Sequence, residues 1–132
     1  MSYCIRLQKA DFHIRQEDKQ RAHAAIMQIG NSSVQEEIAD EIRDHDDVDT
    51  LAIVVSAFGW RLVEDTGDNV VGIRYEGEKC WREEELFKAL APYVVDGSYV
   101  EVTGEDGDHF RWFFTAGKCY QQQAIISWED LP

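Results

Sequence analysis

The chain has few prolines, cysteines and basic residues, and it has no long apolar run. With two prolines in 132 residues and no glycine- or serine-rich linker, nothing marks a domain boundary. We therefore expect a single domain over residues 1–132. No apolar run approaches the roughly 20 residues of a membrane-spanning helix, and residues 1–30 lack the apolar stretch of a signal peptide. We predict no contact with a membrane.

The cysteines give no sign of a disulfide framework. Cys4, Cys80 and Cys119 are odd in number and lie far apart in the sequence. This usage is typical of reduced thiols, and so we predict a cytoplasmic protein. We expect Cys80 and Cys119 to lie in or near the core, where a free cysteine acts as a small apolar residue.

Catalytic and metal-binding motifs are missing as well. The sequence has no C-x-x-C, H-E-x-x-H, G-x-S-x-G or phosphate-binding glycine loop. Residues 65–76 have the length of a calcium loop, but Gly67 replaces an acidic ligand and Val70 replaces the glycine of the sharp bend. We predict no metal, no cofactor and no catalytic residue, so the chain is not expected to be an enzyme.

Negative charge is what the chain has in excess. It carries 26 acidic against 13 basic side chains, a formal net charge of −13. The balance is +2 over residues 1–30, −9 over residues 31–68 and −6 over residues 69–132. A block this acidic repels nucleic acid and anionic membranes and attracts basic surfaces. The predicted partner is therefore a basic protein, with no direct contact to nucleic acid.

Alternation of apolar and polar residues predicts the strands. They are expected over residues 3–14, 60–64, 70–75, 98–103, 109–115 and 118–128. A bend or bulge is expected near residues 9–11. The short turns at Gly104–Gly107 and Ala116-Gly117 join the last three strands into an antiparallel meander.

Apolar residues at helical spacing predict helices over residues 17–29 and 81–91. Another helix is expected to begin at Ser33–Glu36, which has the pattern of a capping box. A short helix capped by Asp49 is expected to follow. The β-branched residues 53–55 leave a strand open as the alternative at that place.

These elements predict the fold class α+β. We expect an antiparallel five- to six-stranded sheet with a C-terminal β-meander and about four helices packed mainly on one face. Phe110, Trp112 and Phe114 alternate along one strand, and we expect them to pack against the helices.

The acidic block is the first candidate site. Side chains three or four residues apart on a helix lie about 5–6 Å from each other, and phosphates along one DNA strand repeat at about 3.4 Å per nucleotide. A band of carboxylates can therefore occupy a basic channel that binds nucleic acid; the alternative is an ordinary solvated face. The candidate residues are Glu36, Glu37, Asp40, Glu41, Asp44, Asp46, Asp47 and Asp49.

The predicted meander offers a second candidate site. Tyr99, Glu101, His109 and Arg111 share the sheet face opposite Phe110 and Trp112 if the strands are regular. They are the polar groups that a small-ligand-binding module or an enzyme would use there. The nearby Glu105, Asp106 and Asp108 are interpreted as residues that form a turn.

Turn and packing residues near the C-terminus form a pattern of their own. They are Pro92-Tyr93, Asp96-Gly97-Ser98-Tyr99, Gly104-Glu105-Asp106-Gly107, Arg111-Trp112, Phe114 and Gly117-Lys118. With this pattern, over roughly residues 50–128, the chain resembles small acidic uncharacterised proteins encoded by bacteriophages and prophages. The resemblance implies a shared fold and a setting in which an acidic domain inhibits a host system. No functional residue carries over from it.

These observations together predict a non-catalytic, acidic protein-interaction module. We expect an inhibitor from a phage or mobile element that binds a basic surface of a host nucleic-acid-handling or defence protein, as a DNA mimic. The alternatives are a ligand-binding module or enzyme that uses the meander face, and an immunity-type protein that neutralises a basic toxin. The oligomeric state stays open.

Overall fold

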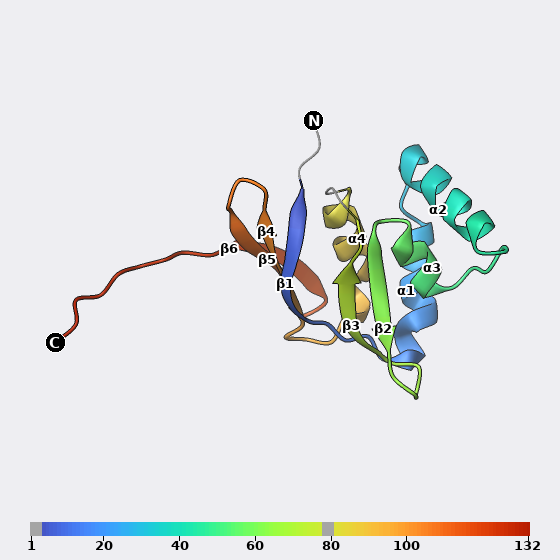
Figure 1. The fold of residues 1–132 in the computed structure, drawn as a ribbon. Helices are drawn as coiled ribbons and strands as arrows, with labels where there is room; N and C mark the ends of the chain where they lie inside the picture. The colour runs from blue at the N-terminus through green and yellow to red at the C-terminus, as the bar shows by residue number, and fades with distance from the viewer. Residues whose placement is uncertain (1–3, 78–80) are drawn as a thin grey trace.

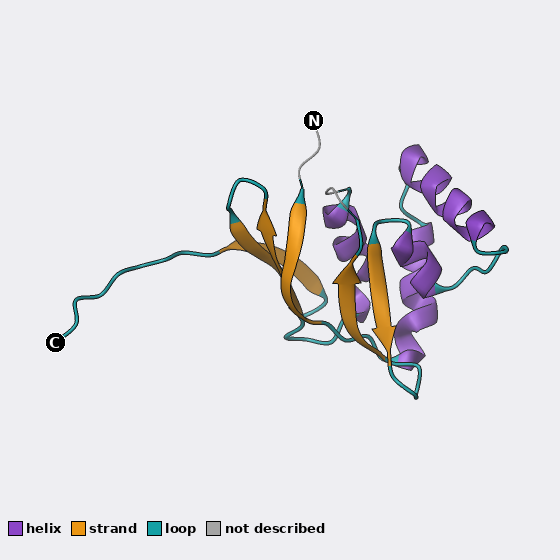
Figure 2. Ribbon diagram, in the orientation of Figure 1, coloured by secondary structure: helices purple, strands orange, loops and turns teal. Residues whose placement is uncertain are grey.

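The computed structural model describes residues 4–77 and 81–132 and confirms the α+β class (Figure 2). Its strands are β1 (Ile5–Asp11), β2 (Trp60–Glu64), β3 (Val70–Tyr75), β4 (Tyr99–Gly104), β5 (His109–Thr115) and β6 (Lys118–Gln123). Its helices are α1 (Lys19–Met27), α2 (Ser32–Asp44), α3 (Leu51–Ser56) and α4 (Glu83–Leu90). The short 3-10 helices η1 (Gln16–Asp18) and η2 (Ala91–Tyr93) adjoin α1 and α4. Tyr3 and Cys80 lie outside the described residues.

The strands divide into two antiparallel sheets, where one sheet was expected. The larger sheet has the order β1-β4-β5-β6, and the smaller one pairs β2 with β3. Ile14, which follows β1, links them through a bridge to Val70 of β3, and it also bridges to Val94. Its backbone N lies 3.1 Å from the Val70 carbonyl, and its carbonyl lies 2.8 Å from the Val70 N. A single bridge at Val70, the first residue of β3, therefore stands in place of a full ladder between β1 and β3.

The predicted C-terminal meander is confirmed. Strand β4 pairs with β5 and β5 with β6 in unbroken antiparallel register. Gly107 and Gly117 have φ angles of 88° and 74°, a conformation that glycine adopts without steric cost. The last strand is shorter than expected: it ends at Gln123 and not at Trp128, and residues 124–132 extend away from the body (Figure 1).

The core forms where α4 meets both sheets. The ring of Phe87 lies 6.4 Å from that of Phe12, 5.3 Å from Trp60, 4.9 Å from Trp112 and 5.8 Å from Phe114, measured between centroids. Trp60 comes from β2, and Trp112 and Phe114 come from β5. Phe87 therefore fastens α4 to strands of both sheets. Helix α1 packs on α4 and α3, and α2 packs on α3 as the outermost helix (Figure 1).

Two helix starts differ from the sequence prediction. Asn31, and not Ser33, caps α2, since its Oδ1 accepts hydrogen bonds from the backbone N of Ser33 at 2.9 Å and of Val34 at 3.3 Å. The segment that was open between helix and strand is α3, capped by Thr50 and not by Asp49. Its buried residues Leu51, Val54 and Val55 have helical spacing, so burial overrides their β-branched character.

Candidate functional site

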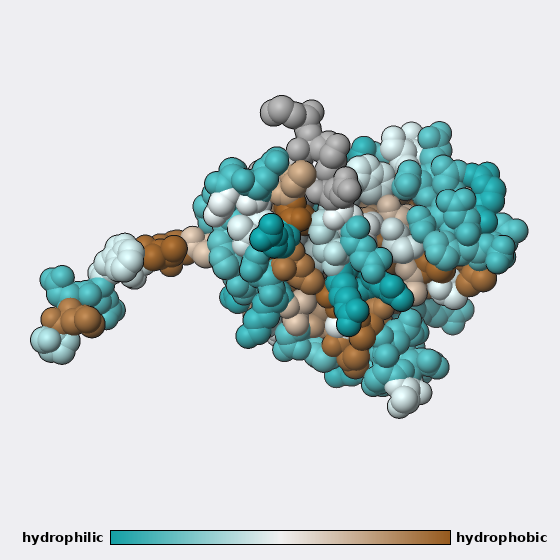
Figure 3. Space-filling model, viewed as in Figure 1, coloured by the Kyte–Doolittle hydropathy of each residue, from teal (hydrophilic) through white to brown (hydrophobic). Residues whose placement is uncertain are grey.

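The first candidate site is the acidic face, which we define as the eight predicted carboxylates from Glu36 to Asp49. Val34 and Ile38 are buried on the side of α2 that meets α3, so the opposite side of the helix faces solvent. Glu41 is half-buried, and the other seven carboxylates are exposed. In Figure 3 the corresponding end of the molecule, where α2 lies in Figure 1, is mostly hydrophilic.

Few cations balance this charge. Arg43 pairs with Asp40, and the imidazole groups of His45 and His23 lie 3.4 Å from Glu41 and 2.5 Å from Asp49. Within residues 4–77 and 81–132, Lys, Arg and His side chains form no ion pair with the five remaining members of the face. These are Glu36, Glu37, Asp44, Asp46 and Asp47. Most of the face therefore presents uncompensated negative charge to solvent.

The backbone at the end of α2 keeps two of these carboxylates in place. Asp46 and Asp47 have φ angles of 56° and 61°, in the left-handed region that Asp tolerates better than most residues. The backbone N of Asp47 donates to the Ile42 carbonyl at 2.9 Å and closes the helix. The turn thus extends the line of carboxylates beyond the last turn of α2.

The second candidate site is the solvent side of the larger sheet, which we call the outer face. Glu101 pairs directly with Arg111 and Tyr99 with Phe113, so Tyr99, Glu101, His109 and Arg111 share this face. The His109 Nε2 lies 2.7 Å from Glu101 Oε1. Hydrogen bonding thus joins two of the four predicted ligand-binding residues.

A hollow of about 470 Å³ lies beside three of these residues. Its described lining residues are Glu101, His109, Phe110, Arg111, Gln122, Gln123 and Ala124. Arg111 Nε donates to Gln122 Oε1 at 2.7 Å, and its guanidinium lies 5.8 Å from the Tyr99 ring and 5.1 Å from the Phe113 ring. The lining offers a cation and hydrogen-bonding groups but no hydroxyl, thiol or amine nucleophile.

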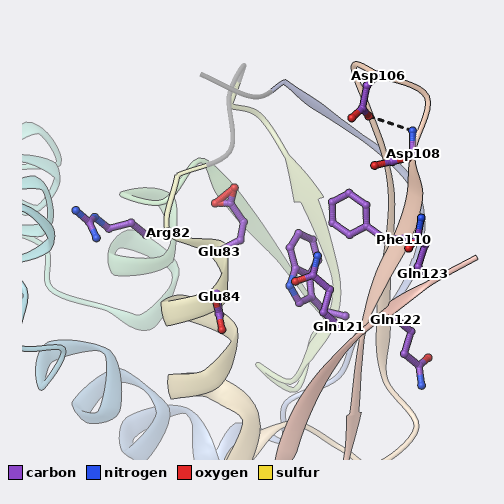
Figure 4. Close-up of a pocket in the computed structure, with 10 residues that line it drawn as sticks. Arg82, Glu83, Glu84, Asp106, Asp108, Phe110, Gln121, Gln122 and Gln123 are labelled. Carbon is purple, nitrogen blue, oxygen red and sulfur yellow. Dashed lines mark hydrogen bonds between the residues drawn. The ribbon is translucent and has the colours of Figure 1, made fainter. Parts of the chain in front are cut away.

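Sequence reasoning missed a larger hollow of about 820 Å³ between the start of α4 and strands β5 and β6 (Figure 4). Its walls carry carboxylates from Glu83, Glu84, Asp106 and Asp108, and Arg82 points away from Phe110 in Figure 4. Glu83 is 3% exposed, and its carboxylate accepts from the Trp81 backbone N at 2.7 Å. The hollow depends on the packing of α4 beside β5, a contact between distant segments that no local pattern indicates.

Two buried nitrogens near this hollow have no hydrogen-bond partner among the described residues. They are Arg82 Nε and the indole Nε1 of Trp112, which is 5% exposed. Cys119 is half-buried beside Trp112 and Lys88, and burial raises the pKa of its thiol to about 11. A thiol with a raised pKa is a poor nucleophile. Cys119 thus behaves as the small, partly buried apolar residue that was expected.

The described residues do not form a metal site or a membrane span. Among residues 4–77 and 81–132, no three His, Cys, Asp or Glu side chains are grouped to hold a metal ion. Over the same residues, no helix is long and apolar enough to span a bilayer. The acidic residues after β4 form a turn, in which Asp106 Oδ1 accepts from the Asp108 backbone N at 3.1 Å.

No match was found in comparisons with protein-family models, with curated proteins or with solved structures. The resemblance to phage-encoded proteins therefore remains a prediction from the sequence.

Proposed function

We propose that the chain is a non-catalytic inhibitor from a phage or another mobile element that binds a basic surface of a host protein. The target is a nucleic-acid-handling or defence protein, and the acidic face takes the place of a DNA phosphate backbone. The supporting observation is that five exposed carboxylates on α2 and its following turn have no cationic partner among the described residues.

Geometry supports the choice of a nucleic-acid-binding surface as the target. Glu36, Asp40 and Asp44 follow one another at every fourth position on the solvent side of α2. Neighbours at this spacing lie about 5–6 Å apart, comparable to the rise of one to two nucleotides at about 3.4 Å each. A helix is also stiffer than a loop, so these charges lose little freedom when a partner binds.

The cost of the uncompensated charge supports a binding role. Like charges along one helix destabilise it by about 0.2–0.5 kcal/mol per pair. A basic partner relieves this repulsion, and the attraction extends over roughly 8 Å at physiological ionic strength. Binding is therefore expected to weaken strongly as the salt concentration rises.

The first test is affinity capture from bacterial lysate with the tagged chain at low and at high salt, with the captured proteins identified by mass spectrometry. The proposal expects a basic nucleic-acid-binding protein that high salt releases and that duplex DNA displaces. Capture of a basic toxin, with loss of its toxicity, would instead indicate an immunity protein. An empty eluate at both salt concentrations would contradict both.

A charge-reversal pair then locates the contact. The test variant changes Glu36, Glu37 and Asp44 to Lys, and the control variant changes Glu17, Glu76 and Glu105 to Lys. All six residues are exposed, and each variant carries a net charge of −7 in place of −13. An exposed pair is worth about 0.2–1 kcal/mol, so three reversals should weaken binding roughly tenfold or more. An equal loss of affinity in the two variants would show that net charge acts and that the acidic face does not.

A further inference from the structure

The C-terminal segment exposes large apolar side chains to solvent. Residues 124–132 run away from the body as an extended chain (Figure 1), with hydrophobic residues near the body and near the tip and more hydrophilic ones between them (Figure 3). Ile125, Ile126, Trp128 and Leu131 are 91%, 83%, 94% and 90% exposed. Soluble proteins seldom leave such a group of side chains in water, and where they do it marks an interaction site. We call residues 124–132 the tail.

The path of the tail directs it away from its own body. The backbone N of Ala124 donates to the His109 carbonyl at 2.8 Å and holds the first tail residue in line with β6. A return to the body would need a reversal at residues 125–127. Ile125 and Ile126 are stiff, β-branched residues that favour extended backbone, and Ser127 is the only residue of this stretch that is common in turns. A second molecule is the better-placed partner.

An aromatic row crosses the outer face. Tyr99 on β4 lies directly opposite Phe113 on β5, which lies directly opposite Tyr120 on β6. Tyr99 and Phe113 are half-buried, and Tyr120 is 46% exposed. Three aromatic side chains in register on a solvent-facing sheet surface form a flat apolar strip beside the hollow near Arg111.

The outer face is also richer in cations than in carboxylates. By strand alternation it carries Arg6, Lys9, Arg111 and Lys118 against Asp11 and Glu101. Both carboxylates already meet histidines: Asp11 lies 2.5 Å from His13 and Glu101 lies 2.7 Å from His109. In a chain of net charge −13, the strand residues of this face carry a formal charge of +2, from four cations and two carboxylates. The tail carries Glu129 and Asp130 and no basic residue, so the two surfaces are complementary in charge.

We propose that the tail of one copy docks on the outer face of a second copy, and that the exchange is reciprocal. In an extended chain Ile126, Trp128 and Asp130 point to the same side. On the second copy, Ile126 lies on the aromatic row and Trp128 lies in the hollow beside Arg111. The guanidinium of this Arg111 stacks on the indole of Trp128. Asp130 then reaches the cations that flank the row. This inference does not depend on the function proposed for the acidic face.

The dimensions permit this arrangement. Nine extended residues span about 30 Å, while four strands span about 14 Å from the first to the last. When the two copies exchange tails about a two-fold axis, each tail is bound on the outer face of the other copy, and the assembly closes as a dimer. Repulsion between the two acidic faces is weak, because α2 lies at the end of the molecule opposite the tail (Figure 1) and charges are screened beyond roughly 8 Å at physiological salt.

The test is analytical ultracentrifugation of the full chain over a wide range of concentrations at physiological salt. We expect the 15.2 kDa chain to form a species of twice that mass. Trp128→Ala removes the main tail contact and Tyr120→Ala removes the exposed end of the aromatic row, and each should raise the dissociation constant about tenfold or more. Met27→Ala, a control at an exposed apolar residue outside both surfaces, should leave it unchanged.

Mixing the two variants separates tail exchange from other dimers. A heterodimer of the two variants has one intact junction, formed by the tail of the Tyr120→Ala chain on the face of the Trp128→Ala chain, and one junction with both substitutions. Since a tail without Trp128 has already lost its main contact, Tyr120→Ala adds little further loss at that second junction, and the heterodimer should form more tightly than either homodimer. Unchanged urea midpoints would show that both variants fold. Three results would each overturn the proposal: a wild-type chain that stays monomeric, a dimer whose dissociation constant neither substitution changes, or a mixture in which heterodimers are not preferred. The first outcome would leave the acidic-face test unaffected.

Discussion

Replacement of Phe87 by Ala tests whether one ring holds α4 to both sheets. Phe87 is fully buried and has ring contacts with Phe12, Trp60, Trp112 and Phe114. A buried Phe→Ala change costs about 3–5 kcal/mol. Four aromatic neighbours from different segments cannot all move into the cavity, so we expect the upper part of this range. This loss is a large fraction of the unfolding free energy, which is roughly 7–20 kcal/mol for a chain of this length.

Urea unfolding, followed by tryptophan fluorescence, measures this loss, because Trp60 and Trp112 report directly on the site. Phe110→Ala is the matched control: Phe110 lies on the same strand as Trp112 but is half-buried, and its ring meets Trp112 at 5.4 Å. We expect the control to lose roughly 1–2 kcal/mol, in the usual range for a partly buried contact. A Phe87→Ala loss below about 2 kcal/mol, or no larger than that of the control, would refute the central role of Phe87.

The remaining predictions concern Cys119 and the cap of α2. Burial raises the pKa of the Cys119 thiol from 9.0 to about 11. Alkylation of Cys119 at pH 8, measured by peptide mass spectrometry, should therefore be roughly a hundredfold slower in the folded than in the unfolded chain. Equal rates in the two states would contradict this prediction. The same shift gives stability that is present below pH 9 and is lost as the pH rises through 11. Asn31→Ala removes the cap of α2 and should lower the unfolding free energy, measured in urea, by about 1 kcal/mol. The control Ser33→Ala should change it very little. A larger loss for Ser33→Ala than for Asn31→Ala would indicate that Ser33 is the cap.

The sequence predicted the meander well because its signals are local. Period-two alternation and short glycine turns fix β4, β5 and β6, and they place Tyr99, Glu101, His109 and Arg111 on one face without any knowledge of the rest. The same alternation misled beyond Gln123. Ile126 and Trp128 continue the pattern of a strand, but none of the strands in the described part of the chain extends alongside them, and a ladder needs a partner.

What the sequence could not show depends on contacts between distant segments. The link between the two sheets depends on the backbone of Ile14, which pairs with Val70 and Val94, and no local pattern indicates it. The acidic face was predicted from helical spacing, yet the position of Asp49 against His23 of α1 emerges only in the fold. The larger hollow likewise requires α4 to lie beside β5.

The pairing of β1 with β4 has a consequence for synthesis on the ribosome. Ile5 pairs with Gly104 and Asp11 with Tyr99, so an early strand finds its ladder only after about ninety further residues are made. At roughly 5–20 residues per second, β1 waits about 5–20 s with its backbone unpaired and Ile5 and Leu7 exposed. Contacts this distant along the chain also slow folding. In the cell, the newborn chain is therefore most open to proteases and chaperones before β4 appears, and its survival depends on how fast the meander emerges.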